Sequence, residues 1–282
     1  MSKERNILVF QTDFGTKETS VSEMYGVVKT VDHSIEIIEG THQLPPYDTW
    51  SASFRLMKAL RWWPEGTIYV SVVDPGVGTD RRASVAKMKN GTYVVTPDNG
   101  TLTHVDAYIG VEEIREIDKS VNMLNTGTSI FHGRDLFGYC AAKLAAGKIS
   151  YEEVGPAYPV SEIIKMELKE PYTEDGIVKG IIEIDDTNFG NLFTNIPTDL
   201  LLQNGMEYGH PVHMTITHDN EVRYEDNAVF DVSFGMVKKG DVIIYNNEMR
   251  RVALAITQGD FMNTFGIGFG NDWEISFEKV EG

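Results

Sequence analysis

Hydrophobic and polar positions follow two periods along the first half of the chain. Short apolar runs of strand length lie at residues 7–10, 35–38 and 68–73. The stretches between them, residues 20–31 and 49–62, carry apolar side chains at helical spacing. Strands and helices that alternate at this length predict an α/β domain with a largely parallel sheet. Ser20 is the expected N-cap of the first helix, with Glu23 as its capping-box partner.

The pattern changes after the third apolar run. Segments 83–88 and 92–96 flank Lys89-Asn90-Gly91, and Asn-Gly between alternating segments predicts a tight β-hairpin. A further strand is expected at 113–117 and a helix at about 134–146. We assign residues 1–160 to this N-terminal domain.

The second half of the chain has a different character. A charged stretch with prolines, residues 161–175, is the expected linker. Beyond it, short strand-like runs are separated by turns and lie at 177–184, 212–217, 242–245 and 252–256. Only residues 199–203 indicate a helix. Residues 176–282 are therefore predicted to form a second, smaller β-domain, a barrel or a sandwich.

The charge of the chain narrows the choice of partner. Its 282 residues include 25 Lys and Arg against 42 Asp and Glu, a formal net charge of −17. Nucleic acid binding depends on basic side chains that displace counterions from phosphates, and docking on anionic lipid depends on the same charges. The acidic balance argues against nucleic acid and membrane partners and suits a small cationic substrate.

Cysteine and histidine usage excludes several classes of site. Cys140 is the only cysteine, so an intramolecular disulfide, a thiolate zinc cluster and an iron–sulfur site are excluded. Its apolar neighbours predict an inert thiol in the core. The six histidines other than His132 show no metal-ligand spacing. We expect no metal site, no secretory leader, no membrane span and a cytoplasmic setting.

Polar turns follow three of the predicted strands. They contain Asp13-Phe14-Gly15, Asp74-Pro75-Gly76-Val77-Gly78-Thr79 with Arg81, and Pro97-Asp98-Asn99-Gly100. Because Asp, Pro and Gly are common turn formers, each turn alone has a purely structural explanation. Ligands of open α/β sheets bind beyond the carboxyl ends of the strands. Three such turns at corresponding ends of one sheet are as consistent with a shared pocket as with plain turns.

Two further segments carry candidate chemistry. Phe131-His132-Gly133-Arg134-Asp135 directly precedes a helix, and we expect His132 to reach the ligand face from another strand end. A buried structural histidine is the alternative. Residues 184–195 combine carboxylates, amides and aromatic rings directly after a strand. Either an Asx-rich turn or a nucleoside pocket with rings stacked on a base explains this composition.

These motifs, taken in order, resemble the S-adenosyl-L-methionine (SAM) hydroxide adenosyltransferases, relatives of the bacterial SAM-dependent fluorinase and chlorinase. The Asp-Pro-Gly-Val-Gly-Thr loop at 74–79 and Phe-His-Gly-Arg-Asp at 131–135 are the specific parts of the resemblance. It implies an N-terminal α/β domain, a smaller C-terminal β-barrel domain and a homotrimer, with SAM between one subunit's N-terminal domain and its neighbour's C-terminal domain. It implies no cofactor, because SAM is the substrate.

The implied reaction is attack of water or hydroxide on the ribose 5′ carbon of SAM, which gives adenosine and L-methionine. The leaving group is a neutral thioether, so the enzyme has mainly to hold a water in line and relieve it of a proton. The family uses a carboxylate, a guanidinium and an imidazole, which match Asp74, Arg81 and His132 as catalytic residues. Halide-using relatives carry other residues at the Asp and His positions, so this trio favours hydrolysis.

The resemblance also implies substrate contacts. Asp13 matches the residue that holds both ribose hydroxyls, Ser20 and Asp186 match contacts to the methionine end, and Asn191 matches an adenine contact. Aromatic positions around the ribose and adenosine correspond to Tyr47, Phe131, Phe189, Phe193 and Phe230.

Some positions depart from the fluorinase pattern. Glu18 replaces an aspartate at the methionine end. Glu248 aligns close to the position where the fluorinase has an arginine that contacts the methionine carboxylate, and Arg250 or Arg251 could take over that role. Two other functions also remain open, namely a halogenase of the same fold and a non-catalytic protein that binds adenosine or SAM.

Overall fold

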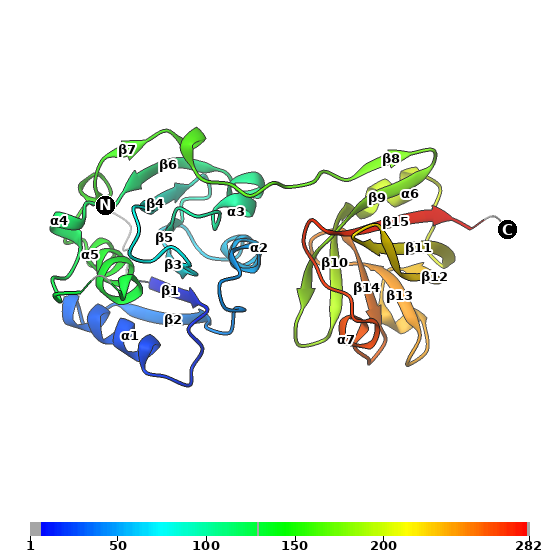
Figure 1. Cartoon of the computed structure of the whole chain (residues 1–282), viewed down its shortest axis with the longest axis horizontal. Coiled ribbons are helices and arrows are strands. Elements are labelled where there is room, and N and C mark those ends of the chain that lie inside the picture. The colour runs from blue at the N-terminus through cyan, green and yellow to red at the C-terminus, as the bar shows by residue number, and fades with distance from the viewer. Residues whose placement is uncertain (1–6, 129, 281–282) are drawn as a thin grey trace. The chain divides into compact units, whose positions relative to one another are not determined.

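The computed structural model describes residues 7–128 and 130–280 and divides into two compact units, Met1–Met166 and Glu167–Gly282 (Figure 1). The division falls within the stretch 161–175, which the sequence marks as a linker. Strand β8 (Tyr172–Glu174) also lies in this stretch and pairs with the strand that follows it, so part of the expected linker belongs to a sheet.

The N-terminal unit contains one seven-stranded sheet. Its strands are β1 (Ile7–Thr12), β2 (Glu36–Thr41), β3 (Ile68–Val72), β4 (Ala83–Met88), β5 (Tyr93–Pro97), β6 (Val111–Glu116) and β7 (Ala157–Tyr158). Their order is β2-β1-β3-β5-β4-β6-β7. The first four strands of that order are parallel, and β4, β6 and β7 add an antiparallel side. The carboxyl ends of β1, β3 and β5 therefore lie at one edge, as the sequence predicts.

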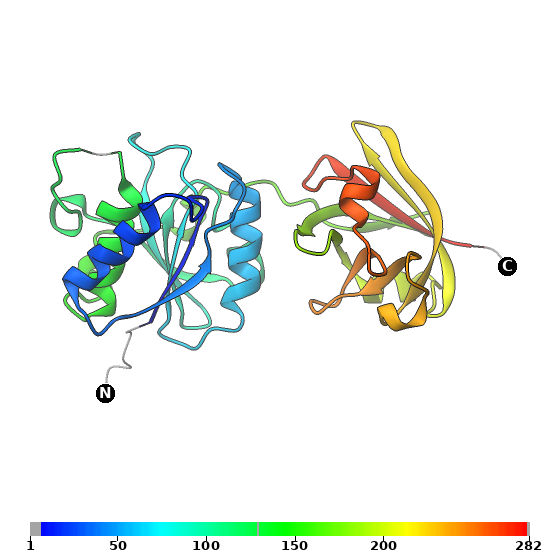
Figure 2. The same cartoon turned by 90° about the horizontal axis from the view of Figure 1, so that it is seen from below.

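Helices cover both faces of this sheet (Figure 2). Helices α1 (Ser20–Val31) and α5 (Tyr139–Ala145) lie on one face, and α2 (Thr49–Leu60) lies on the other. The shorter helical segments are α3 (Thr103–Tyr108), α4 (Lys119–Asn122), η2 (Glu152–Val154) and η3 (Val160–Glu162). β3 is buried at every position, as expected for a strand covered on both sides. The predicted α/β fold is thereby confirmed.

Two helix starts differ from the expectation. Thr19, not Ser20, occupies the N-cap position of α1, and no side chain caps the helix; the Thr19 hydroxyl instead donates to the carboxylate of Glu23 at 2.9 Å. The predicted capping box is therefore wrong. The helix expected at 134–146 begins as a π-helical segment, η1 (Gly133–Gly138), and continues as α5. Such wider turns recur at functional sites.

The C-terminal unit is a β-barrel. Beyond β8, its strands are β9 (Ile177–Asp186), β10 (Asn191–Pro197), β11 (His210–His218), β12 (Glu221–Asp231), β13 (Val242–Asn246), β14 (Arg251–Ile256) and β15 (Trp273–Lys279). They follow the order β10-β14-β13-β12-β11-β15-β9-β8, and an additional β9–β10 pairing closes the ring. The helical segments are α6 (Thr198–Gln203), η4 (Phe234–Met236) and α7 (Phe261–Phe265). The barrel expected from the resemblance is confirmed.

Each unit has its own apolar core. In the N-terminal unit, Cys140 lies in that core with no exposed surface, and burial raises the pKa of its thiol to about 12. The thiol is therefore inert, as the sequence predicts. Within the described residues, no helix is long and apolar enough to cross a membrane.

Candidate active site

A cavity of about 640 Å³ lies at the carboxyl ends of β1 and β3 in the N-terminal unit. Asp13 follows β1 and Asp74 follows β3, so the parallel register of these strands places both carboxylates in its wall. The remaining predicted residues in the wall are Ser20, Tyr47, Phe131 and His132. The structure therefore gathers predicted residues from four separate segments. The third polar turn, Pro97–Gly100, is not part of this wall.

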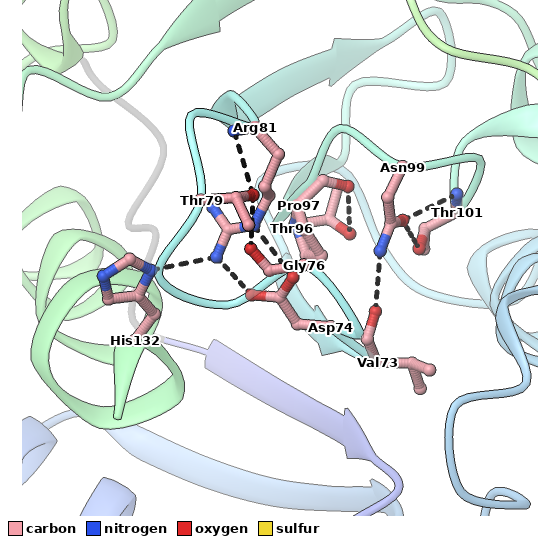
Figure 3. A network of polar contacts seen from close by, with 10 residues as sticks. All are labelled: Val73, Asp74, Gly76, Thr79, Arg81, Thr96, Pro97, Asn99, Thr101 and His132. Carbon is pink, nitrogen blue, oxygen red and sulfur yellow. Dashed lines mark hydrogen bonds and ion pairs between the residues drawn. The ribbon is translucent and has the colours of Figure 1, made fainter. Parts of the chain in front are cut away.

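Asp74, Arg81 and His132 form one chain of polar contacts (Figure 3). The Arg81 guanidinium donates from Nε to Asp74 Oδ1 at 2.8 Å and from Nη2 to Oδ2, so the pair is bidentate. The same Nη2 lies 3.0 Å from His132 Nδ1. The side chains of Arg81 and Asp74 are only 8% and 6% exposed. Charge-assisted contacts between buried groups hold this arrangement more firmly than surface ion pairs do.

The contact with Arg81 determines which ring nitrogen of His132 carries the proton. A guanidinium can only donate, so Nδ1 accepts and the neutral imidazole holds its proton on Nε2. Burial, and then the Arg81 charge, lowers the pKa of His132 below its usual value. His132 is therefore a neutral hydrogen-bond donor in the wall of the cavity at neutral pH.

His132 reaches the cavity by a route that differs from the expectation. It directly precedes η1, as predicted, but in the described part of the chain the elements that flank it are α4 and η1 rather than a strand. The expectation that it sits at another strand end is wrong. The π-helical turn at Gly133 presents the imidazole instead.

The turn after β2 supports Asp13. The backbone N–H of Tyr47 donates to Asp13 Oδ2 at 2.9 Å, and Tyr47 adopts a left-handed conformation with φ of 66°. Burial raises the pKa of Asp13, and the charge of nearby Asp74 contributes to this shift. The Tyr47 ring itself is 73% exposed. Asp13 Oδ2 is thus bonded to the backbone of this turn, and the carboxylate lies in the wall of the cavity.

Two aromatic rings, those of Phe14 and Phe131, also line the cavity. Phe131 packs edge-on against Phe14 with 5.8 Å between ring centroids. Arg134 lies over the Phe131 ring at 4.9 Å, and buried Asp135 accepts from its Nε at 2.6 Å. Arg134 and Asp135 thus hold the Phe131 ring beside His132, and we regard Phe14 as a wall residue that sequence reasoning missed.

The predicted residues of the C-terminal unit fall into two groups. Asp186, Phe189 and Asn191 lie in or beside the turn between β9 and β10, where Phe189 is 66% exposed. Phe193 and Phe230 are buried on β10 and β12, and Phe230 packs on Tyr208 with 4.5 Å between ring centroids. The segment 184–195 is therefore a hairpin, with its polar turn between β9 and β10.

The two candidate arginines also differ from each other. Arg251 is buried and pairs with the carboxylate of Glu183, whereas Arg250 is exposed and pairs with Asp199 at 3.2 Å. Arg251 is thus already engaged inside the barrel. For metals, no group of three or more His, Cys, Asp or Glu residues with suitable geometry occurs among the described residues.

Comparison with known proteins follows the same division into two units. The family model for the SAM hydroxide adenosyltransferase N-terminal domain matches residues 8–155, and the model for the C-terminal domain of the same family matches residues 180–274.

Relatives of this chain carry two kinds of name. An (R)-S-adenosyl-L-methionine hydrolase from Methanocaldococcus jannaschii is 29% identical over 247 residues, which cover 86% of each protein. A fluorinase from an Actinoplanes species is 26% identical over 272 residues, which cover 88% of this chain and 90% of the relative. The crystal structure of an uncharacterized conserved protein from Thermotoga maritima has a TM-score of 0.87 at 34% identity and covers 96% of this chain and 100% of the other. Both units match models of one family, and the chain therefore belongs to the SAM hydroxide adenosyltransferase family.

Proposed function

We propose that the protein is a SAM hydrolase that converts SAM and water to adenosine and L-methionine. The observation that carries this proposal is the bonded chain of Asp74, Arg81 and His132 beside a cavity that also contains Asp13. Family membership and relatives named (R)-S-adenosyl-L-methionine hydrolase support it. The acidic chain also suits a substrate with a sulfonium charge.

The geometry suggests a separate task for each member of the trio. Asp74 is the only anion among them, so it accepts a hydrogen bond from the attacking water and draws its proton away. His132 donates from Nε2 to the water oxygen, because its Nδ1 is occupied by Arg81. Arg81 holds the two groups at a fixed separation. The water oxygen bonds to the 5′ carbon, the carbon–sulfur bond breaks, and its electron pair remains on the neutral thioether of methionine.

We propose that the other groups bind the substrate. Asp13 has the geometry to accept from both ribose hydroxyls, with Phe131 and Tyr47 as walls and Ser20 toward the methionine end. In the C-terminal unit we assign Asp186 to the methionine end, and Asn191 and the aromatic residues to the adenosine. Phe189 is the exposed ring among these, so we expect it to make the direct contact and Phe193 and Phe230 to support it from the core.

We further propose a homotrimer in the cytoplasm. The trimer is supported by the family, and the cytoplasmic setting by a single cysteine, which is buried and not part of a disulfide. Light scattering on purified protein tests the assembly, because the mass of a trimer is about three times the chain mass of 31.6 kDa.

The deciding experiment is incubation of the protein with SAM in halide-free buffer made with oxygen-18 water. Adenosine that carries the label, together with methionine, supports hydrolysis at the 5′ carbon. Parallel reactions contain chloride or fluoride, and a halogenated adenosine there would replace our proposal with a halogenase. SAM or adenosine bound without turnover would instead identify a binding protein. Activity should also persist in EDTA, since departure of a neutral thioether needs no Lewis acid.

A further inference from the structure

The turn Pro97–Thr101 contains one of the three polar turns noted in the sequence, yet it does not line the cavity. It lies directly beside the loop that carries Asp74 and Arg81 (Figure 3). Between those two residues the loop is exposed from Val77 to Asp80 and is held by local turns, such as Thr79 N–H to Gly76 O at 3.1 Å. Its position relative to the sheet therefore depends on the two ends of the loop.

Asn99 holds the first end. Its Nδ2 donates to the carbonyl of Val73, the residue before Asp74, at 2.9 Å. Its Oδ1 accepts from the Thr101 hydroxyl at 2.8 Å and from the Thr101 N–H at 3.3 Å. Only an amide side chain of this size combines such a donor with such an acceptor. An aspartate would keep the acceptor and bring its charge against the Val73 carbonyl.

The neighbouring residue holds the second end. The backbone N–H of Asp98 donates to the carbonyl of Arg82, the residue after Arg81, at 2.9 Å. The Asp98 carboxylate in turn accepts from Ile164 N–H at 2.9 Å and from the Tyr158 hydroxyl at 3.1 Å. Asp98 and Asn99 of one short turn thus bind the backbone immediately before Asp74 and immediately after Arg81.

We propose that Asn99 is a positioning residue that holds the Asp74–Arg81 loop at the separation from His132 that hydrolysis requires. The inference rests on the proposed hydrolase function and deepens it. Asn99 acts through the Val73 carbonyl rather than on the substrate. Because a misplacement of about 1 Å can cost about 100-fold in rate, a loosened loop should lower turnover without weakening the contacts of Asp13.

The chain contains a matched control for this role. Asn90-Gly91-Thr92 repeats the Asn-Gly-Thr sequence of residues 99–101. Asn90 Nδ2 donates to the carbonyl of Leu60 at 3.1 Å, and its Oδ1 accepts from the Thr92 hydroxyl at 2.7 Å. Its local contacts are the same, but it braces the end of α2 rather than the catalytic loop. Thr92 and Thr101 are both completely buried, so substitutions at these two threonines are better matched than those at the two asparagines.

The test compares Asn99→Asp and Thr101→Val with Asn90→Asp and Thr92→Val, all in the full chain. We expect Asn99→Asp to lower kcat about 10–100-fold and Thr101→Val about 3-fold, with KM for SAM within about twofold of wild type. The two control variants should keep kcat and KM within about twofold, although they lose the same local hydrogen bonds. Melting temperatures measured in parallel report how much each of the four substitutions destabilises the fold.

A second readout does not depend on turnover. The charged groups that act on His132 are Arg81, Lys119, Asp74 and Asp135, and the Arg81 contribution is the largest of these. If the hydrogen bond from Asn99 to the Val73 carbonyl is lost, we expect Arg81 to move away from His132. The pKa of His132 measured by NMR should then rise toward its usual value. Thr101→Val tests this without a new charge, and Thr92→Val should leave the pKa in place.

Each outcome decides the proposal. Equal kcat losses in the two Asn variants would overturn it, because the effect would then be general destabilisation. An unchanged kcat in Asn99→Asp, or a rise in KM alone, would also overturn it. If wild-type protein does not hydrolyse SAM, the hydrolase proposal fails, and the NMR comparison of the two Thr variants still decides whether Asn99 positions the loop.

Discussion

The two units of this protein prepare their candidate functional groups in opposite ways. In the N-terminal unit, Asp74, Arg81 and His132 are bonded to one another and buried. In the C-terminal unit, Asp186, Phe189 and Asn191 lie in or beside an exposed hairpin turn, where the Phe189 ring is 66% exposed. Groups fixed before the substrate arrives need no reorganisation when charge develops, which is the main source of electrostatic catalysis. We therefore expect the α/β unit to provide the reaction geometry and the turn of the barrel to add contacts to the substrate.

The strongest way to break the comparison is to remove the imidazole. We expect His132→Ala to lower kcat about 1,000-fold, because the water loses its donor and Arg81 loses a partner. SAM binding measured by calorimetry should change less than about threefold, since the Asp13 contacts remain. Asp74→Asn is the second variant, in case the first perturbs the fold. Equal losses of binding and turnover would mean that the trio binds substrate rather than water.

Two phenylalanines test whether the barrel separates recognition from stability. Phe230 is fully buried in the barrel core, so Phe230→Ala should reduce the free energy of unfolding by about 3–5 kcal/mol in denaturant titrations. Phe189→Ala removes an exposed ring and should leave stability within about 0.5 kcal/mol. It should raise KM for SAM about 3–10-fold through the loss of stacking. A Phe189 variant with normal KM would remove the turn from the substrate site.

A substitution of Asp13 tests whether substrate binding and catalysis are carried by different residues within the N-terminal unit. Asp13→Asn keeps the side-chain shape but weakens acceptance from two ribose hydroxyls, so KM should rise about 10–100-fold. The effect on kcat should be smaller than that of His132→Ala, because Asp13 is not bonded to the trio. Steady-state kinetics with SAM measures both values, and a larger effect on kcat would assign Asp13 to the chemistry.

The mildest perturbation is pH. The pKa of His132 is lowered, so the neutral imidazole persists below pH 6.5 and activity falls only when pH drops through the lowered value. Protonation places hydrogens on both ring nitrogens, and Nδ1 can then no longer accept from Arg81. We expect kcat to be constant above about pH 6.5 and to fall about tenfold per pH unit below the pKa. The same limb in His132→Ala would assign it to another group.

Much of the fold follows from local patterns. Helix α1 has the predicted bounds, and Asn90-Gly91 marks the hairpin of β4 and β5, because apolar period and turn chemistry act over a few residues. Strand β12 was not predicted, because residues 221–227 are mostly exposed and charged. Only their pairing with β11 identifies them as a strand. Strand β10 was missed because the composition of residues 184–195 suggested an Asx-rich turn or a nucleoside pocket.

The candidate site was predictable in its parts but not in its connections. The short separation of Asp74 and Arg81 places them in one loop, whereas the contact of Arg81 with His132 joins residues 51 positions apart. The role of Asn99 was also hidden, because its partner is a backbone carbonyl, which leaves no trace in the sequence. Residue types indicate chemistry, but long-range contacts follow from the tertiary fold.

The buried thiol of Cys140 has a practical consequence for work in solution. A thiol with a pKa raised to about 12 and no exposed surface will not react with maleimide reagents near neutral pH. A cysteine introduced at Asn188, on the tip of the β9–β10 hairpin, would therefore be the only site of labelling without any prior removal of the native one. A fluorophore at that position would report directly on whether the hairpin meets a nucleoside.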